Sequence, residues 1–181
     1  MCFDGITIVV SPLISLMNDQ VRALRQCGIP AAYLNTSLDE NVIAGVLSQA
    51  KNGAYKIIYV APERLGTHSF REFCSKVKIS FIAIDEAHCV SQWGQDFRPS
   101  YLDIKEFIAS LEKRPVVAAF TATATKIVKQ DICTLLGLRS PEEIATGFDR
   151  ENLYFEVVRV KYKLTALKRY LDLYSGSSGI V

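Results

Sequence analysis

Two adjacent carboxylates, Asp85 and Glu86, follow directly after an apolar run at residues 81–84. The run is too short for a helix and is flanked by polar residues, which is typical of a strand buried on both faces of a parallel sheet. Open α/β sheets bind ligands at the carboxyl ends of their strands, so both acids are predicted to lie at a ligand site. Asp85 could hold Mg²⁺, directly or through water, and Glu86 could polarise an attacking water. An acid pair that closes a strand is also ordinary turn chemistry.

Aromatic and basic side chains follow the acids within the run CVSQWGQDFRPSY. Trp93 and Phe97 offer faces on which unpaired bases can stack, at roughly 1–3 kcal/mol per base, and Arg98 adds a cation for a phosphate or a ring. The alternative is that the two aromatic residues fill a hydrophobic gap. The loop is polar, contains glycine and follows the acid pair, which favours base binding.

The segment at residues 85–101, DEAHCVSQWGQDFRPSY, resembles the DEAH form of the Walker B motif and the aromatic-rich loop of the RecQ family of DNA helicases. The resemblance implies that this segment couples single-stranded DNA to ATP hydrolysis. It implies catalytic and nucleotide-binding roles for Asp85 and Glu86, with Mg²⁺ on Asp85, and places His88 in the catalytic motif. The family usually carries His where this chain has Gln95, so no role of that imidazole is carried over.

Residues 10–21, VSPLISLMNDQV, resemble motif Ia of the same family, in which the segment after a strand touches the DNA backbone. The contacts implied are Ser11, Pro12 and Ser15. Serine hydroxyls and free amides at a helix start suit a phosphate. Plain helix capping is the alternative.

Residues 61–65, APERL, resemble motif Ib of the family, and Arg64 is the implied phosphate contact. An internal ion pair between Arg64 and the adjacent Glu63 is the alternative.

Residues 121–125, TATAT, resemble motif III and follow another predicted buried strand. Thr121 and Thr123 could hydrogen-bond the acid pair and the γ-phosphate, and could switch when the phosphate leaves. Thr125 is expected to cap the following helix.

Composition limits the alternatives. The 181 residues, 49% hydrophobic and 22% charged, suit one well-buried globular domain. The formal charge of +2 does not indicate a nucleic-acid binder, so any DNA contact must come from local geometry. Five cysteines without a C-x-x-C pair, and two histidines, support neither a disulfide framework nor a zinc site. With no apolar stretch of ~20 residues and no signal peptide, we expect a cytoplasmic protein without membrane contact, nucleoid-associated if bacterial.

Short apolar runs alternate with amphipathic patterns, which predicts an α/β fold with a parallel sheet and flanking helices. The motifs make it RecA-like, that is, a P-loop NTPase fold. The predicted strands are residues 6–10, 31–34, 56–60, 81–84 and 116–120. Helices are predicted after residue 12, after a capping box at residues 37–40, and at residues 101–111 and 126–136.

Residues 1–147 are expected to form a first RecA-like domain that lacks its N-terminal P-loop part. Residues 148–181 would be the inter-domain junction and the start of a second RecA-like domain, with a strand at 153–160, a helix at 164–174 and a further strand beginning at 179. The sequence has no Gly-Lys pair and hence no G-x-x-x-x-G-K-[ST] loop. We therefore expect the isolated chain to bind and hydrolyse ATP poorly, and to expose the apolar surface beside the omitted strand.

The resemblance implies a fragment of an ATP-dependent DNA helicase that translocates 3′ to 5′ on single-stranded DNA and unwinds duplexes in DNA repair and recombination. ATP and Mg²⁺ are the implied cofactors, and zinc belongs only to a C-terminal region of the parent protein. Single-stranded and partly duplex DNA are the implied partners, with the P-loop segment and second RecA-like domain of the parent helicase. The alternatives are a non-catalytic nucleic-acid-binding module, a decayed helicase gene product and, disfavoured by the aromatic loop, an RNA helicase.

Overall fold

The structure is a computed structural model that describes residues 4–145 and 152–180. The chain divides between Glu142 and Glu143 into two units, which are described separately. The expected domain boundary after residue 147 lies outside the described residues.

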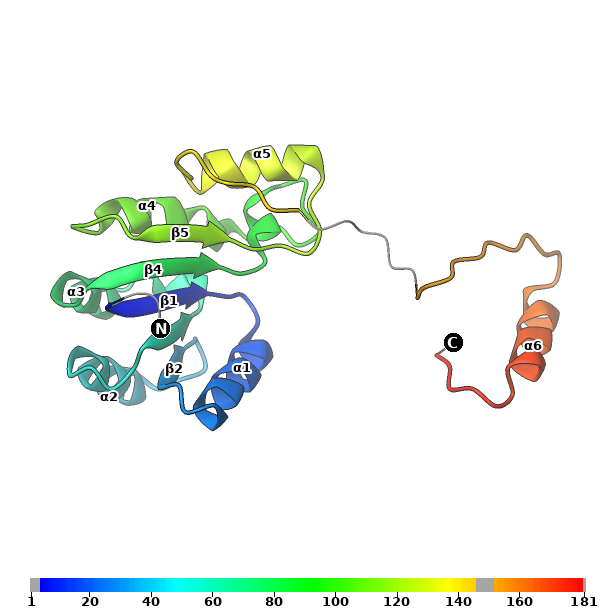
Figure 1. Cartoon of the computed structure of the whole chain (residues 1–181), viewed down its shortest axis with the longest axis horizontal. Coiled ribbons are helices and arrows are strands. Elements are labelled where there is room, and N and C mark those ends of the chain that lie inside the picture. The colour runs from blue at the N-terminus through cyan, green and yellow to red at the C-terminus, as the bar shows by residue number, and fades with distance from the viewer. Residues whose placement is uncertain (1–3, 146–151, 181) are drawn as a thin grey trace. The chain divides into compact units, whose positions relative to one another are not determined.

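The first unit is built on a five-stranded parallel sheet with strand order β2-β3-β1-β4-β5 (Figure 1). Its strands are β1 (Ile6–Val10), β2 (Ala31–Leu34), β3 (Ile57–Val60), β4 (Ile79–Ile84) and β5 (Val116–Ala119). Val10 at the end of the central β1 is in register with Val60 of β3 and Ile84 of β4. The residues that follow these strands therefore meet at one edge of the sheet, as the sequence predicted.

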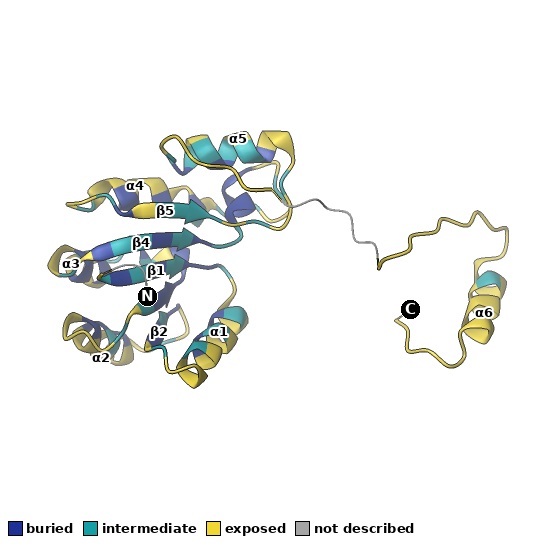
Figure 2. Cartoon of the chain, in the orientation of Figure 1, coloured by how far each residue is buried: buried dark blue, intermediate teal, exposed yellow. Residues whose placement is uncertain are grey.

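Five helices and three short 3₁₀ turns lie within residues 4–142 of this unit. They are α1 (Ile14–Gln26), α2 (Glu40–Lys51), η1 (Pro62–Arg64), α3 (His68–Lys76), η2 (Ala87–Val90), η3 (Pro99–Tyr101), α4 (Asp103–Ser110) and α5 (Lys126–Leu135). Met17 and Val21 of α1 pack with Tyr59 in one apolar cluster. The other four helices contribute buried residues to a larger cluster that includes buried residues of β1 and β4, and dark blue segments lie along the strands in Figure 2.

Two helix predictions need correction. The helix expected at residues 101–111 is shorter, because the chain makes a 3₁₀ turn from Pro99 to Tyr101 before α4 begins at Asp103. Helix α3 was not predicted, although Phe70, Phe73 and Cys74 have the i, i+3, i+4 spacing of a buried helix face.

The predicted capping box before α2 does not form. Asn35, which is fully buried, accepts hydrogen bonds from the Ser37 backbone N–H (3.0 Å) and hydroxyl (2.8 Å) through its side-chain oxygen. Asp39 is the N-cap of α2 and its side chain makes no capping bond. The helix therefore begins too late for Ser37 to be its N-cap, and the Glu40 carboxylate that the box also requires is paired with Arg64.

β5 forms one edge of the sheet, beside β4. Val116 on this strand is 54% exposed, and Phe120 immediately after it is 53% exposed. Apolar surface is therefore open along this edge of the described unit.

Among the described residues of the second unit there is one helix, α6 (Lys163–Leu173), which agrees with the prediction to within a residue. The strand predicted at residues 153–160 is wrong, because these residues form no strand and residues 152–180 offer no partner strand. No side chain of α6 is buried, and the helix is almost wholly yellow in Figure 2. Gly179 and Ile180 form no strand either, and Val181 lies outside the described residues. Across the described residues, no helix has the length and apolar character needed to cross a membrane.

Candidate functional site

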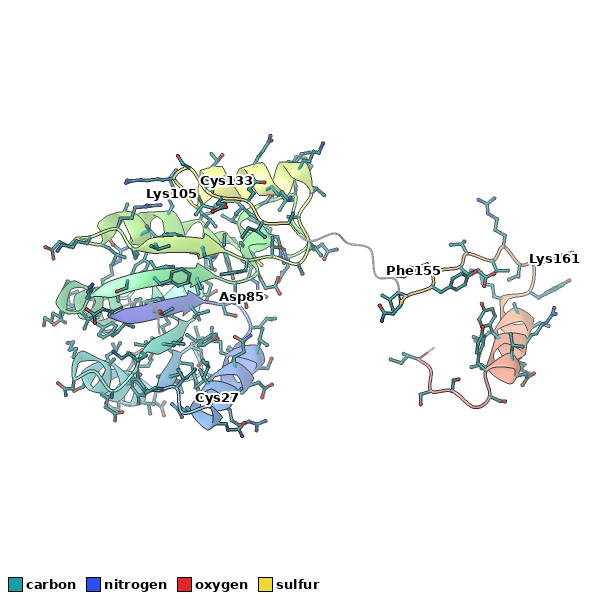
Figure 3. The ribbon with its side chains drawn as sticks, in the orientation of Figure 1. Cys27, Asp85, Lys105, Cys133, Phe155 and Lys161 are labelled. Carbon is teal, nitrogen blue, oxygen red and sulfur yellow. The ribbon has the colours of Figure 1, made fainter. Side chains whose placement is uncertain are left out.

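Asp85 lies where β4 ends, at the carboxyl ends of the strands (Figure 3). Its backbone N–H donates to the Val10 carbonyl (2.9 Å), which continues the β1–β4 ladder beyond Ile84. The buried Ser11 hydroxyl donates to Asp85 Oδ2 (3.3 Å), and the Glu86 N–H donates to Oδ1 (3.0 Å). Asp85 is therefore held from two strands of the sheet.

Tyr101 hydrogen-bonds to the backbone at the acid pair. Its hydroxyl donates to the Asp85 backbone carbonyl (2.9 Å), and its side chain is fully buried. Burial, and then the nearby Cys89 and Asp85, raise the pKa of Tyr101, so the phenol remains a neutral donor. Burial and the charge of Asp85 also raise the pKa of Tyr59.

Glu86 has a left-handed backbone conformation (φ 46°, ψ 44°), which is uncommon for a residue other than glycine. The turn is fixed on both sides: the Ala87 N–H donates to the Phe120 carbonyl (2.8 Å), and the Cys89 N–H donates to the Glu86 carbonyl (2.9 Å). Strained conformations of this kind persist where the surrounding structure imposes them, and they concentrate at functional sites.

His88 connects the acids to the threonine segment. Its Nδ1 lies 3.3 Å from Glu86 Oε2 and 3.0 Å from Thr121 Oγ1, and its side chain is buried. Glu86, His88 and Thr121 thus form one polar chain across the ends of β4 and β5.

The threonine prediction was wrong about the partner. Thr121 hydrogen-bonds His88, not the acids, because η2 turns the His88 ring toward the end of β5. The Thr123 N–H donates to Thr121 Oγ1 (3.3 Å). Thr125 caps α5 as predicted, since its hydroxyl accepts the Val128 N–H (3.3 Å). A contact of Thr121 or Thr123 with the γ-phosphate stays a prediction.

The Trp93 side chain is 77% exposed, so it fills no gap in the described unit. The Trp93 backbone N–H donates to the Ser91 hydroxyl (3.1 Å), and the Gly94 N–H donates to the Ser91 carbonyl (3.0 Å). Phe97 is half-buried. The turn therefore presents the indole to solvent, as a stacking platform requires.

Arg98 ties this loop to the turn after β1. Its Nε and Nη2 donate to Asp96 Oδ2 (3.0 and 2.8 Å), and its Nη1 donates to the Pro12 carbonyl (3.1 Å). The hydrogen bond with Asp96 is the main cause of the raised pKa of Arg98. Two of the predicted DNA contacts, Arg98 and Pro12, are therefore adjacent.

The two predicted serine contacts differ in exposure. Ser11 is fully buried against Asp85, whereas Ser15 is exposed in the first turn of α1. Helix capping is the wrong explanation for both, since Leu13 is the N-cap of α1 and no side chain caps it.

Arg64 makes an internal ion pair, but not with Glu63. Its Nη1 donates to Glu40 Oε1 (2.7 Å) and its Nε to the Asn35 carbonyl (3.3 Å), with the side chain only 14% exposed. Glu63 instead accepts the Ser100 hydroxyl (3.0 Å).

The oxygen atoms at Asp85 suit a hard cation. Within residues 4–145 and 152–180, no group of three or more His, Cys, Asp or Glu side chains could hold a metal ion. Mg²⁺ is typically bound through one or two carboxylates together with substrate phosphates, and Asp85, oriented by the Ser11 hydroxyl, supplies one such carboxylate.

Sequence reasoning missed Asp131 of α5. Its Oδ2 accepts the Ser91 hydroxyl at 2.5 Å across 40 residues of chain. Nothing local in the sequence distinguishes this acid from a solvated one on a helix surface.

Residues 3–131 match the profile of the family described as DEAD/DEAH box helicase. The chain belongs to the DEAD/DEAH box helicase family. Within that family it is similar to the ATP-dependent DNA helicase RecQ of Bacillus subtilis (strain 168), with 46% identity over 99% of this chain and 30% of the relative. It is 42% identical to the RecQ helicase of Pasteurella multocida (strain Pm70), over 100% of this chain and 28% of the relative. These relatives place the chain in the RecQ branch of the helicase family.

A solved structure of the Mycobacterium smegmatis helicase Lhr, bound to ssDNA and AMP-PNP, superposes with a TM-score of 0.59 at 17% identity, over 96% of this chain and 25% of Lhr. This likeness confirms the RecA-like helicase fold. The chain spans less than a third of the length of the curated relatives it matches.

Proposed function

We propose that this chain is the part of a RecQ-type, ATP-dependent DNA helicase in which the water-activating acids meet the single-stranded-DNA sensor. The observation that carries the proposal is the continuous polar chain from Glu86 through His88 to Thr121, directly beside the loop that exposes Trp93.

In the proposed mechanism, Glu86 orients and polarises the attacking water, and His88 holds the Glu86 carboxylate in place. Asp85, fixed by Ser11 and by the Tyr101 hydroxyl beneath it, would hold Mg²⁺. When bound, the ion neutralises charge on the phosphates of ATP. Thr121 links the acids to β5, so a shift at either end reaches the other.

Single-stranded DNA is the proposed activator. Trp93 offers a base-stacking face, and Arg98 and Pro12 bring the motif Ia turn to the same loop. The Arg98 guanidinium is engaged with Asp96, and a DNA phosphate would compete with that carboxylate. Translocation from 3′ to 5′, duplex unwinding in DNA repair and recombination, and a cytoplasmic location are part of the proposal. The free cysteines among the described residues are consistent with a reducing compartment.

The test is ATP hydrolysis, with and without oligothymidine, by a polypeptide of the relatives' length that contains this segment. Trp93→Ala should lower the ratio of DNA-stimulated to DNA-independent turnover by at least about tenfold, which corresponds to about 1.4 kcal/mol of lost coupling. Gln92→Ala, an exposed neighbour, is the matched control. Equal loss of both rates in Trp93→Ala would show that the residue serves packing and not sensing.

The second candidate is a non-catalytic nucleic-acid-binding module, a role that the exposed Trp93 face would serve equally well. The intact mass of the native polypeptide separates the two candidates. A mass well above 20.2 kDa, with Mg²⁺-dependent hydrolysis, supports the helicase. A mass of 20.2 kDa with DNA binding but no hydrolysis supports the module.

A further inference from the structure

Ser91 is a buried residue of the aromatic-rich loop whose side chain makes two hydrogen bonds. Its side chain is completely inaccessible, and its hydroxyl donates to Asp131 Oδ2 at 2.5 Å. The Ser91 hydroxyl oxygen also accepts the Trp93 backbone N–H at 3.1 Å. A hydroxyl has one proton, and with that proton committed to the carboxylate, its lone pairs are left to accept the Trp93 amide. Asp131 therefore fixes the direction of this hydrogen-bond chain.

Asp131 belongs to the helix that follows the threonine segment. Helix α5 begins at Lys126, directly after its N-cap Thr125 and a few residues beyond Thr121. Val128 and Ile132 on either side of Asp131 are buried in the apolar cluster that contains Ala87 and Val90 of η2. Helix α5 and η2 are thus packed together and joined at their polar ends.

Side chains of the segment that follows the acids therefore contact both the threonine segment and α5. One contact is His88 with Thr121 (3.0 Å), on the side of the acids. The other is Ser91 with Asp131 (2.5 Å), on the side of Trp93. Hydrogen bonds to a carboxylate are shorter and stronger than neutral ones, so the second contact is well suited to transmit a displacement.

We propose that Asp131 is a positioning residue for Trp93: through the Ser91 hydroxyl, its carboxylate holds the Trp93 backbone in register with α5 and the Thr121 segment. The DNA-coupling part of this role rests on the proposed function of the loop. The positioning part depends only on the contacts above. Asp131 touches neither the DNA nor the nucleotide in this proposal, so its effect must appear at Trp93.

Trp93 is the only tryptophan of the chain, so its fluorescence reports this loop alone. The test compares wild type, Asp131→Ala, Asp131→Asn and the control Gln130→Ala, an exposed neighbour on α5. The first measurement is the Trp93 anisotropy decay without DNA, and the second is quenching of Trp93 by oligothymidine. Circular dichroism checks that each variant is folded, and Ser91→Ala, which removes the same link, replaces Asp131→Ala if that variant unfolds.

Without DNA, Asp131→Ala should show a faster local motion of Trp93, while Gln130→Ala matches wild type. Asp131→Asn should stay close to wild type, since its amide oxygen can accept the Ser91 hydroxyl. With oligothymidine, the quenching midpoint of Asp131→Ala should move at least about fivefold higher, by the arithmetic of a lost coupling of about 1 kcal/mol.

Unchanged Trp93 motion in a folded Asp131→Ala would overturn the positioning role, and so would an Asp131→Asn variant that behaves like Asp131→Ala. Absence of quenching in the wild type would count against the DNA-sensing function instead. The measurement without DNA would still decide the role of Asp131.

Discussion

Gly94→Ala should destabilise the loop that carries Trp93. A Cβ on Gly94 would lie 2.3 Å from the His88 carbonyl oxygen and 3.1 Å from the Ser91 carbonyl oxygen. These are backbone atoms, and the His88 carbonyl already accepts the Ser91 N–H (3.1 Å), so it cannot retreat without breaking the turn. Overpacking of this kind costs about 1–3 kcal/mol, and we expect the free energy of unfolding to fall by about 2 kcal/mol.

The same substitution at Gly45 provides the control. Gly45 is exposed within α2, and no atom outside its own helix backbone and chain neighbours lies within 4 Å of the added Cβ. Alanine is the better helix former by about 0.8–1.0 kcal/mol, so this variant should be stabilised by about that amount.

Urea unfolding, followed by far-UV circular dichroism, measures the free energy of unfolding of both variants. With a slope of about 2 kcal/mol/M, the midpoint should fall by about 1 M in Gly94→Ala and rise by about 0.5 M in Gly45→Ala. A Gly94→Ala midpoint at or above that of the wild type would refute the steric argument and show that the loop has room to rearrange.

Three further predictions concern two buried side chains near the acids, one for Tyr101 and two for Cys89. Tyr101→Phe leaves the Asp85 backbone carbonyl without its buried hydrogen-bond donor, so it should lower the free energy of unfolding by about 1–3 kcal/mol. The control Tyr55→Phe removes an exposed hydroxyl and should change that free energy by less than about 0.5 kcal/mol. Equal urea midpoints for the two variants would contradict this role of Tyr101. Burial raises the pKa of the Cys89 thiol to about 11, so at pH 8 only about one molecule in a thousand carries the Cys89 thiolate. A thiol reagent should therefore label the exposed Cys27 but should not label Cys89 until the chain unfolds. Because the unfolded chain loses this proton first, near pH 8.5, the free energy of unfolding should fall between about pH 8.5 and 11 more steeply in the wild type than in Cys89→Ala. Parallel pH profiles would show that the buried thiol makes no such contribution.

Patterns along the chain predicted the sheet closely. The β-branched run of β1 and the short apolar run of β2 were placed at their observed bounds, because a buried parallel strand shows as a continuous apolar segment. The acids and threonines were placed at one edge for the same reason: each follows a parallel strand.

The errors arise where a side chain chooses between partners that are distant in sequence. Arg64 pairs with Glu40 across 24 residues, not with its neighbour Glu63. The capping box fails for a related reason, because the Glu40 carboxylate that it requires pairs with that same distant Arg64, and α2 begins only at Glu40. A strand at residues 153–160 satisfies every local preference, yet a strand exists only when another one pairs with it.

The strand order has a consequence for how this chain folds as it is synthesised. β1 lies between β3 and β4, whereas the strand made next, β2, is not its neighbour in the sheet. When β1, α1 and β2 have left the ribosome, the run ITIVV of β1 still has neither hydrogen-bonding partner, and it remains so until residues 57–60 and then 79–84 emerge. Non-local parallel pairing is slow and leaves such edges open to aggregation. The central strand of the described sheet therefore waits longest for its partners during synthesis, and its apolar run is a segment that a chaperone would protect.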